Sequence, residues 1–142
     1  MGYDKWNIIG TVSNILPATV SMTSTNVWYT GATCSLPSGV WFLSGTIDVY
    51  RVATTAQQYQ FRIYDNTGAT ALCSTEVYKT SLAYNRTSVS MNTIVSLSAT
   101  SSILLQAKSS TSTLDIISPR AQNDSTSPTS STHLDCIYIS NI

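Results

Sequence analysis

The chain has 142 residues, of which only 10% are charged, against about 25% in an average soluble domain. Seven basic residues are scattered among seven acidic ones, so no basic stripe exists that could neutralise nucleic-acid phosphates. No apolar run is long enough to span a membrane, and the first residues lack the apolar core of a signal peptide. We therefore expect neither nucleic acid nor membrane as a partner.

Serine and threonine are unusually frequent, whereas lysine and glutamate, which favour helices, are scarce. Threonine is β-branched and suits the surface of a pleated sheet. A chain of this length forms one domain with one hydrophobic core. The composition therefore predicts an all-β protein, organised as an antiparallel β-sandwich or jelly roll.

The first 25 residues show mixed periodicity and end in a polar stretch, so they form either an N-terminal docking arm or a first strand. Trp6, Ile8 and Ile9 are the candidate docking residues of this segment. We assign residues 26–142 to the jelly-roll domain. Within it, residues 26–30 and 32–36 are expected as two short strands that Gly31 separates.

The central element is a long strand that follows a turn at Pro37-Ser38-Gly39. Over residues 40–50, one face carries Trp41 and other apolar side chains, and the opposite face changes from apolar to polar along the strand. Gly45 lies in the middle of the apolar face and has no side chain to pack. It predicts either a bulge or a close approach of another element.

Alternating segments continue to the end of the chain. A clean half-buried strand is expected at residues 57–65, followed by a turn with Gly68 in the left-handed conformation. Further strands are expected at residues 69–79, 87–98, 103–108, 114–117 and 134–139, with a long exposed loop between the last two. The total is about eight to ten short strands, as in a sandwich or barrel.

The three cysteines, Cys34, Cys73 and Cys136, lie in strand-like segments and form no C-x-x-C pair. Free cysteine behaves as a small hydrophobic residue. We expect reduced, buried thiols; the alternative is one disulfide with one free thiol.

The sequence shows no pattern of a catalytic or metal site. His133 is the only histidine, and Asp135 would share its strand face, but no serine is placed beside them. The acidic residues have no spacing typical of a calcium or magnesium site, and no glycine-rich phosphate loop is present. We therefore expect no enzymatic activity and no cofactor. The exposed loop is the candidate binding loop, with Arg120, Gln122, Asn123 and Asp124 as its polar residues.

Three segments resemble a known family when taken in order. They are Gly39-Val40-Trp41-Phe42-Leu43-Ser44-Gly45, Tyr64-Asp65-Asn66-Thr67-Gly68 and Leu134-Asp135-Cys136-Ile137-Tyr138-Ile139. Their order and spacing resemble the trimeric jelly-roll head domains of bacteriophage virion proteins, which are similar to tumour-necrosis-factor and complement heads. The resemblance covers about residues 26–142 and bears on the fold more than on the role.

Several strands are apolar on both faces, which supports a trimer independently of the resemblance. One face can fill the core, and the other would leave an exposed patch that soluble monomers avoid. Contact with two further copies would cover it; the alternative is a monomer whose strands are covered on both sides. The candidate trimer-interface residues are Val40, Phe42, Tyr50, Tyr64, Ile137 and Ile139.

The resemblance implies a non-enzymatic structural protein of a bacteriophage virion, assembled in the host cytoplasm. Within that class we favour a capsid decoration or cement protein, whose partners are its own copies and other virion proteins such as the major capsid protein. An N-terminal segment of this length, at roughly 3.3 Å per extended residue, could reach a neighbouring subunit. The alternative is a tail-fibre or baseplate head that binds a host-surface glycan or protein.

Overall fold

A computed structural model of the chain describes residues 10–51, 56–79, 85–110, 115–117 and 132–141, and their regular structure is entirely β-strand. Among these residues no helix is long and apolar enough to cross a membrane. The strands are β1 (Thr11–Ile15), β2 (Val20–Met22), β3 (Tyr29–Leu36), β4 (Gly39–Arg51), β5 (Gln57–Asp65), β6 (Thr70–Lys79), β7 (Asn85–Leu97), β8 (Ser101–Ser109), β9 (Asp115–Ile117) and β10 (His133–Ser140).

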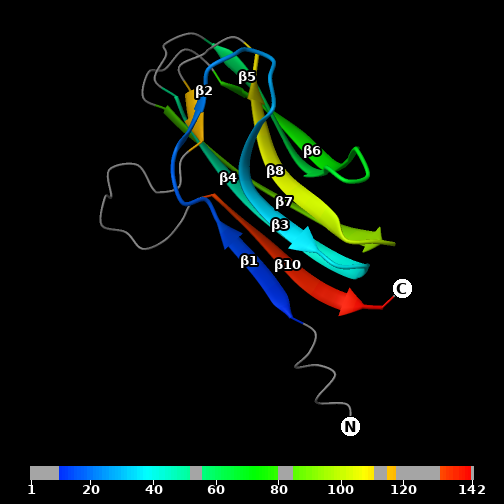
Figure 1. The fold of residues 1–142 in the computed structure, drawn as a ribbon. Helices are drawn as coiled ribbons and strands as arrows, with labels where there is room; N and C mark the ends of the chain where they lie inside the picture. The colour runs from blue at the N-terminus through cyan, green and yellow to red at the C-terminus, as the bar shows by residue number, and fades with distance from the viewer. Residues whose placement is uncertain (1–9, 52–55, 80–84, 111–114, 118–131, 142) are drawn as a thin grey trace.

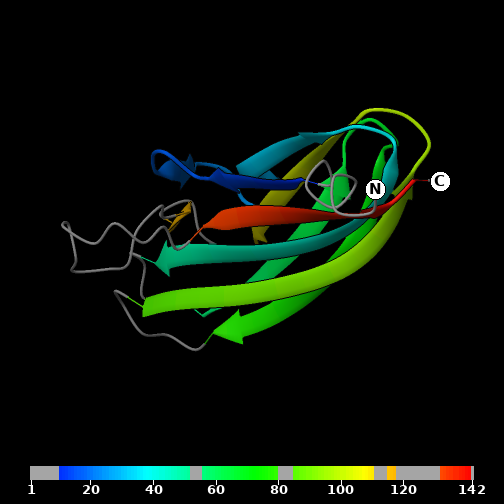
Figure 2. The same ribbon diagram turned by 90° about the horizontal axis from the view of Figure 1, so that it is seen from below.

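Strand β4 is the axis of a six-stranded sheet. Strand β7 pairs with it along its whole length on one side, and β10 and β9 follow one another along its other side. Beyond these lie β1, which pairs with β10, and β2, which pairs with β9. Figure 2 shows β1, β10, β4 and β7 side by side in that order.

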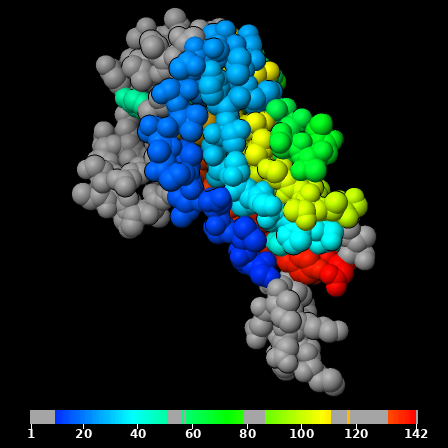
Figure 3. Space-filling view, in the orientation of Figure 1, coloured from blue at the N-terminus to red at the C-terminus, as the bar shows by residue number. Residues whose placement is uncertain are grey.

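A second sheet of four strands, in the order β3-β8-β5-β6, packs against the first. Strand β1 contacts β3 at one edge of the sandwich, and β6 contacts β7 at the other. Figure 1 shows the two layers, and Figure 3 shows β1 and β3 next to each other on the surface at the closed edge. All pairings between these strands are antiparallel. The predicted antiparallel sandwich is confirmed.

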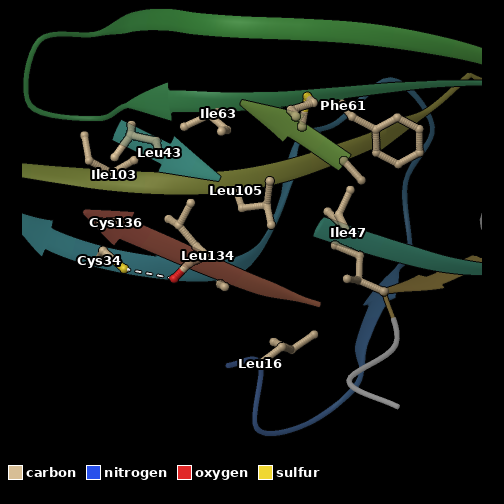
Figure 4. Close-up of a cluster of buried hydrophobic side chains, with 14 of the residues drawn as sticks. Leu16, Cys34, Leu43, Ile47, Phe61, Ile63, Ile103, Leu105, Leu134 and Cys136 are labelled. Atoms are coloured by element: carbon tan, nitrogen blue, oxygen red, sulfur yellow. Dashed lines mark hydrogen bonds between the residues drawn. The ribbon is translucent and has the colours of Figure 1, made fainter. Parts of the chain in front are cut away.

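The core lies between the sheets and takes one face of each strand (Figure 4). On β4 the Trp41 face is the inner one: Leu43, Ile47 and Val49 have no exposed surface, and Trp41 is 3% exposed. The side chains in between, from Val40 to Tyr50, lie on the outer face of the six-stranded sheet. From the other sheet, the core receives fully buried Phe61, Ile63, Ile103 and Leu105.

Gly45 allows the two sheets to approach closely. A Cβ atom at this position would lie 2.9 Å from Cδ1 of Leu105 on the opposite sheet. The pairing of β4 with β7 runs through Gly45 without a register shift. Of the two predictions for this glycine, the close approach is therefore correct, and the bulge is not.

Two other glycines affect the backbone of β3 and the start of β4. Residues 29–36 form one strand, β3, and its pairing with β8 shifts register between Thr30 and Thr33. The predicted break at Gly31 is therefore an irregularity within a continuous strand. Gly39, at the start of β4, has φ = 144°, in the region that the turn prediction assigned to glycine.

The turn between β5 and β6 differs from the prediction at one residue. The carboxylate Oδ1 of Asp65 accepts hydrogen bonds from the backbone N–H groups of Thr67 and Gly68, each at 3.0 Å. The left-handed residue is Ala69, with φ = 52°, rather than Gly68. The reversal is therefore completed one residue later than the sequence pattern predicts.

Replacing Ala69 by glycine is expected to stabilise the protein. The left-handed conformation costs an L-residue about 1–2 kcal/mol, and glycine loses about 0.5–1 kcal/mol of that gain through its greater freedom in the unfolded chain. The free energy of unfolding should rise by up to about 1 kcal/mol, measured by urea denaturation. An Asn66→Gly variant in the same turn is the control, because Asn66 has no positive φ and should gain nothing.

The first 25 residues are integrated into the sandwich where they are described. Strands β1 and β2 extend the six-stranded sheet, and Leu16 and Met22 belong to the core. Within residues 11–22 the chain therefore forms two short strands of the sandwich. Trp6, Ile8 and Ile9, the predicted docking residues, lie outside the described residues.

The three cysteines are free thiols, as expected. Cys34 and Cys136 are buried, whereas Cys73 is half-buried. Cys34 Sγ donates to the backbone oxygen of Leu134 at 3.6 Å, which Figure 4 marks. A hydrogen bond with Cys34, together with burial, raises the pKa of the Cys136 thiol, so this thiol remains protonated and unreactive at neutral pH.

Candidate interaction surface

The outer face of the six-stranded sheet carries a row of apolar side chains that crosses three adjacent strands. Phe42 on β4 is paired with Ile94 on β7 and, on the other side, with Ile137 on β10. Directly paired residues on one face of antiparallel strands have their side chains in contact range. We call Ile94, Phe42 and Ile137 the apolar row.

The two outer members of the apolar row are exposed to solvent in the protomer, and Phe42 between them is half-buried. Ile94 is 65% exposed and Ile137 is 45% exposed. Ile139, next to a register shift on β10, and Ile15 on β1 are also largely exposed. Among the described residues, four of the six most exposed large hydrophobic side chains therefore belong to this one sheet. Such a concentration is typical of an interaction surface rather than of scattered surface residues.

Small polar side chains flank the apolar row. The next row across the sheet is Asn92, Ser44, Asp135 and Ser13, and the one after it is Ser90, Thr46, His133 and Ile15. Thr46 and Ser90 are linked by a hydroxyl–hydroxyl hydrogen bond of 3.0 Å. The polar flank therefore consists mainly of hydroxyl and amide groups that can pair across an interface without burying many charges.

Five of the six predicted interface residues belong to this sheet. Val40, Phe42 and Tyr50 lie on the outer face of β4, and Ile137 and Ile139 lie on β10. Tyr64 does not join them, because β5 belongs to the four-stranded sheet. The residue alternation predicted that the Tyr64 side chain points away from the core. It could not predict to which of the two sheets its strand belongs.

His133 and Asp135 share one strand face, as predicted, and the fold adds Ser13. The Ser13 hydroxyl donates to Asp135 Oδ1, and His133 Nε2 lies 3.6 Å from Asp135 Oδ2. The carboxylate is thus the central group, whereas in a serine–histidine–aspartate relay the histidine lies between the other two. Sequence reasoning missed Ser13 because its proximity depends on the pairing of β1 with β10.

The predicted binding-loop residues Arg120, Gln122, Asn123 and Asp124 lie outside the described part of the chain. Within the described part, no group of three or more histidine, cysteine or acidic side chains is arranged to hold a metal ion.

The outer face of the four-stranded sheet has a different character, which sequence reasoning also missed. The guanidinium carbon of Arg62 lies 4.1 Å from the Trp28 ring centroid and 3.9 Å from that of Tyr64. Arg62 Nε also donates to Gln106 Oε1 at 2.7 Å. These contacts join residues from β5 and β8 and from the segment before β3 into a polar and aromatic surface. The outward alternation of Arg62 and Tyr64 was visible in the sequence, but Trp28 is distant from them in the chain.

Comparison with known proteins supports the fold and assigns no family. No family model matches the chain, and no curated protein matches its sequence. Similar solved structures include the T13 viral particle of infectious bursal disease virus, with a TM-score of 0.58, 12% identity and coverage of 91% of this chain. The VP2 subviral particle of the same virus has a TM-score of 0.54 and 10% identity over 91% of this chain.

The present chain spans about a third of the length of these viral chains, with 31% and 32% covered. Eiger TNF from S. frugiperda matches end to end instead, with a TM-score of 0.54, 10% identity and coverage of 93% of this chain and 94% of Eiger. At such identities the likeness concerns the fold alone. The chain therefore has a jelly-roll fold of the kind found in viral capsid and TNF-like proteins.

Proposed function

We propose that this chain is a non-enzymatic structural protein of a bacteriophage particle, which forms a homotrimer and decorates or cements the capsid surface. The observation that carries the proposal is the apolar row on the outer face of the six-stranded sheet. Its partners are two further copies of the chain at this face and the major capsid protein below the trimer.

A second copy of the chain is the partner that best suits this face. The apolar row lies mainly among hydroxyl and amide side chains, with His133 and Asp135 as an ionisable pair of its polar flank. A copy of the chain could therefore cover this face while burying few charges. In a closed ring, each copy presents the same residues around the axis and covers the apolar surface of its neighbours. The fold also occurs in the particles of infectious bursal disease virus, where a jelly roll is part of a viral assembly.

The first test is the mass of the purified chain in solution. The chain mass is 15.3 kDa, and light scattering coupled to gel filtration should give about three times that value over a range of concentrations. A stable species of one chain mass at all concentrations would contradict the homotrimer.

The second test addresses the role on the particle. Phage particles assembled without this protein should lose infectivity at lower temperature than complete particles, and added trimer should restore their heat resistance. Unchanged heat resistance would contradict the cementing role while leaving the trimer in place. Because the two tests are independent, a failure of the particle role can be told apart from a failure of the assembly.

A further inference from the structure

A pocket opens on the four-stranded sheet where β5 begins and β8 ends. It is lined by Asn26, Gln58, Gln60, Lys108 and Ser110, and its volume is about 130 Å³. Pockets for drug-sized ligands have roughly 300–1,000 Å³, so this pocket suits one ring-sized polar molecule rather than an extended chain. All five lining side chains are polar, which favours a ligand rich in hydrogen-bonding groups.

The backbone around the pocket is held by hydrogen bonds between its walls. Asn26 N donates to Ser109 O at 2.7 Å, Ser110 N donates to Gln58 O at 3.0 Å, and Gln58 N donates to Ser110 Oγ at 3.2 Å. Asn26 has φ = 59°, a conformation that asparagine tolerates better than most residues. The walls are therefore positioned before a ligand arrives, which lowers the entropy lost on binding.

Glu76 determines which groups the two glutamines can offer. Gln58 Nε2 donates to Glu76 Oε2 at 2.9 Å, and Gln60 Nε2 donates to Glu76 Oε1. Because each amide has a donor committed to the carboxylate, the carbonyl oxygens of both glutamines remain as acceptors. Acceptors at fixed positions suit the hydroxyl groups of a sugar, each of which can donate.

Lys108 adds a positive charge to these acceptors. Its Nζ lies 4.9 Å from the Trp28 ring centroid, and no ion pair to Lys108 occurs among the side chains that the structure describes. Arg62 stacks against the same indole, so two cations lie near one aromatic ring. These two cations outnumber the Glu76 carboxylate, which already accepts hydrogen bonds from both glutamines, so the surface attracts an anionic group. The ammonium of Lys108 is the cation that lines the pocket.

We propose that this pocket binds a single pyranose sugar that carries a carboxylate, as the terminal residue of an acidic glycan does. Lys108 pairs with the carboxylate, and the amide groups of Asn26, Gln58 and Gln60 bind the hydroxyls. The site lies on the opposite sheet from the apolar row, and none of its lining residues belongs to that row. The inference therefore does not depend on the proposed assembly or particle role.

Titration of the isotope-labelled protein with methyl glycosides of N-acetylneuraminic acid, glucuronic acid and glucose tests the proposal by NMR. At least one acidic sugar should cause saturable shifts at the backbone amides of Gln58, Lys108 and Ser110 in the millimolar range, and glucose should bind at least about tenfold more weakly. Such a ratio corresponds to the loss of one hydrogen bond to a charged group. No saturable shift with either acidic sugar would overturn the proposal.

Variants and a second probe separate recognition of a sugar from general attraction of anions. Lys108→Met should weaken binding of the acidic sugar at least about tenfold, and Lys108→Arg, which keeps the charge, should lose much less. An unchanged spectrum away from the pocket shows that each variant is folded. Equal binding by Lys108→Met and the parent chain, or equally tight binding of inorganic phosphate, would overturn the proposal.

Discussion

Replacing Ile94 by glutamate is expected to convert the proposed trimer into monomers. Ile94 is 65% exposed in the protomer, so the substitution should leave the protomer fold intact. In the trimer the same carboxylate would be buried against apolar neighbours, and it would be present three times around one axis. Burial of an unpaired charge costs several kcal/mol, and about 4 kcal/mol already corresponds to a thousandfold weaker association.

Tyr78→Glu is the matched control for this variant. Tyr78 is 69% exposed, close to the value for Ile94, but it belongs to β6 of the four-stranded sheet. It should therefore remain trimeric by light scattering at concentrations where Ile94→Glu has the mass of one chain. If Ile94→Glu stayed trimeric, or if Tyr78→Glu dissociated, the interface would not be the outer face of the six-stranded sheet.

Replacing Phe61 by alanine is expected to lower the free energy of unfolding by about 3–5 kcal/mol. Phe61 has no exposed surface, and its ring centroid lies 6.1 Å from that of Tyr59 on the same strand. Alanine would remove the buried aromatic ring and leave a cavity between the two sheets that only partial relaxation could fill.

Urea denaturation at one fixed protein concentration measures this loss, because the stability of an oligomer depends on concentration. Tyr78→Ala is the control on the neighbouring strand β6; its side chain is mostly exposed, and a change within about 0.5 kcal/mol is expected. If Phe61→Ala lowered the free energy of unfolding by less than about 1 kcal/mol, the Phe61 ring would not be an important part of the core.

The two outer faces of the sandwich are chemically different. The six-stranded sheet exposes isoleucines among small polar groups. The four-stranded sheet carries glutamine side chains together with arginine and lysine cations that lie over aromatic rings. The first face is suited to be covered by copies of the chain. The second is suited to face solvent and to bind a polar ligand.

The class of the fold and the inner face of its strands can be predicted from the amino-acid pattern alone. Alternation in residues 40–50 separated the Trp41 face from the Phe42 face, and the structure confirms the first as core. Sheet strands repeat every two residues, so this information is local and can be read without knowing the partner strands. The turn at Gly39 could also be predicted from local sequence, because its backbone conformation excludes most other residues.

The pairing of the strands and the resulting neighbours of each side chain became known only from the folded arrangement. The apolar row needs Phe42, Ile94 and Ile137 in register on three strands, and the pocket needs Asn26, Gln58 and Lys108 at one end of the other sheet. For the same reason, the sequence did not indicate that Tyr64 lies on a different sheet from the other candidate interface residues. Alternation gives the face of a residue but not its sheet or its partner, since strand pairing is set by contacts between segments far apart in the chain.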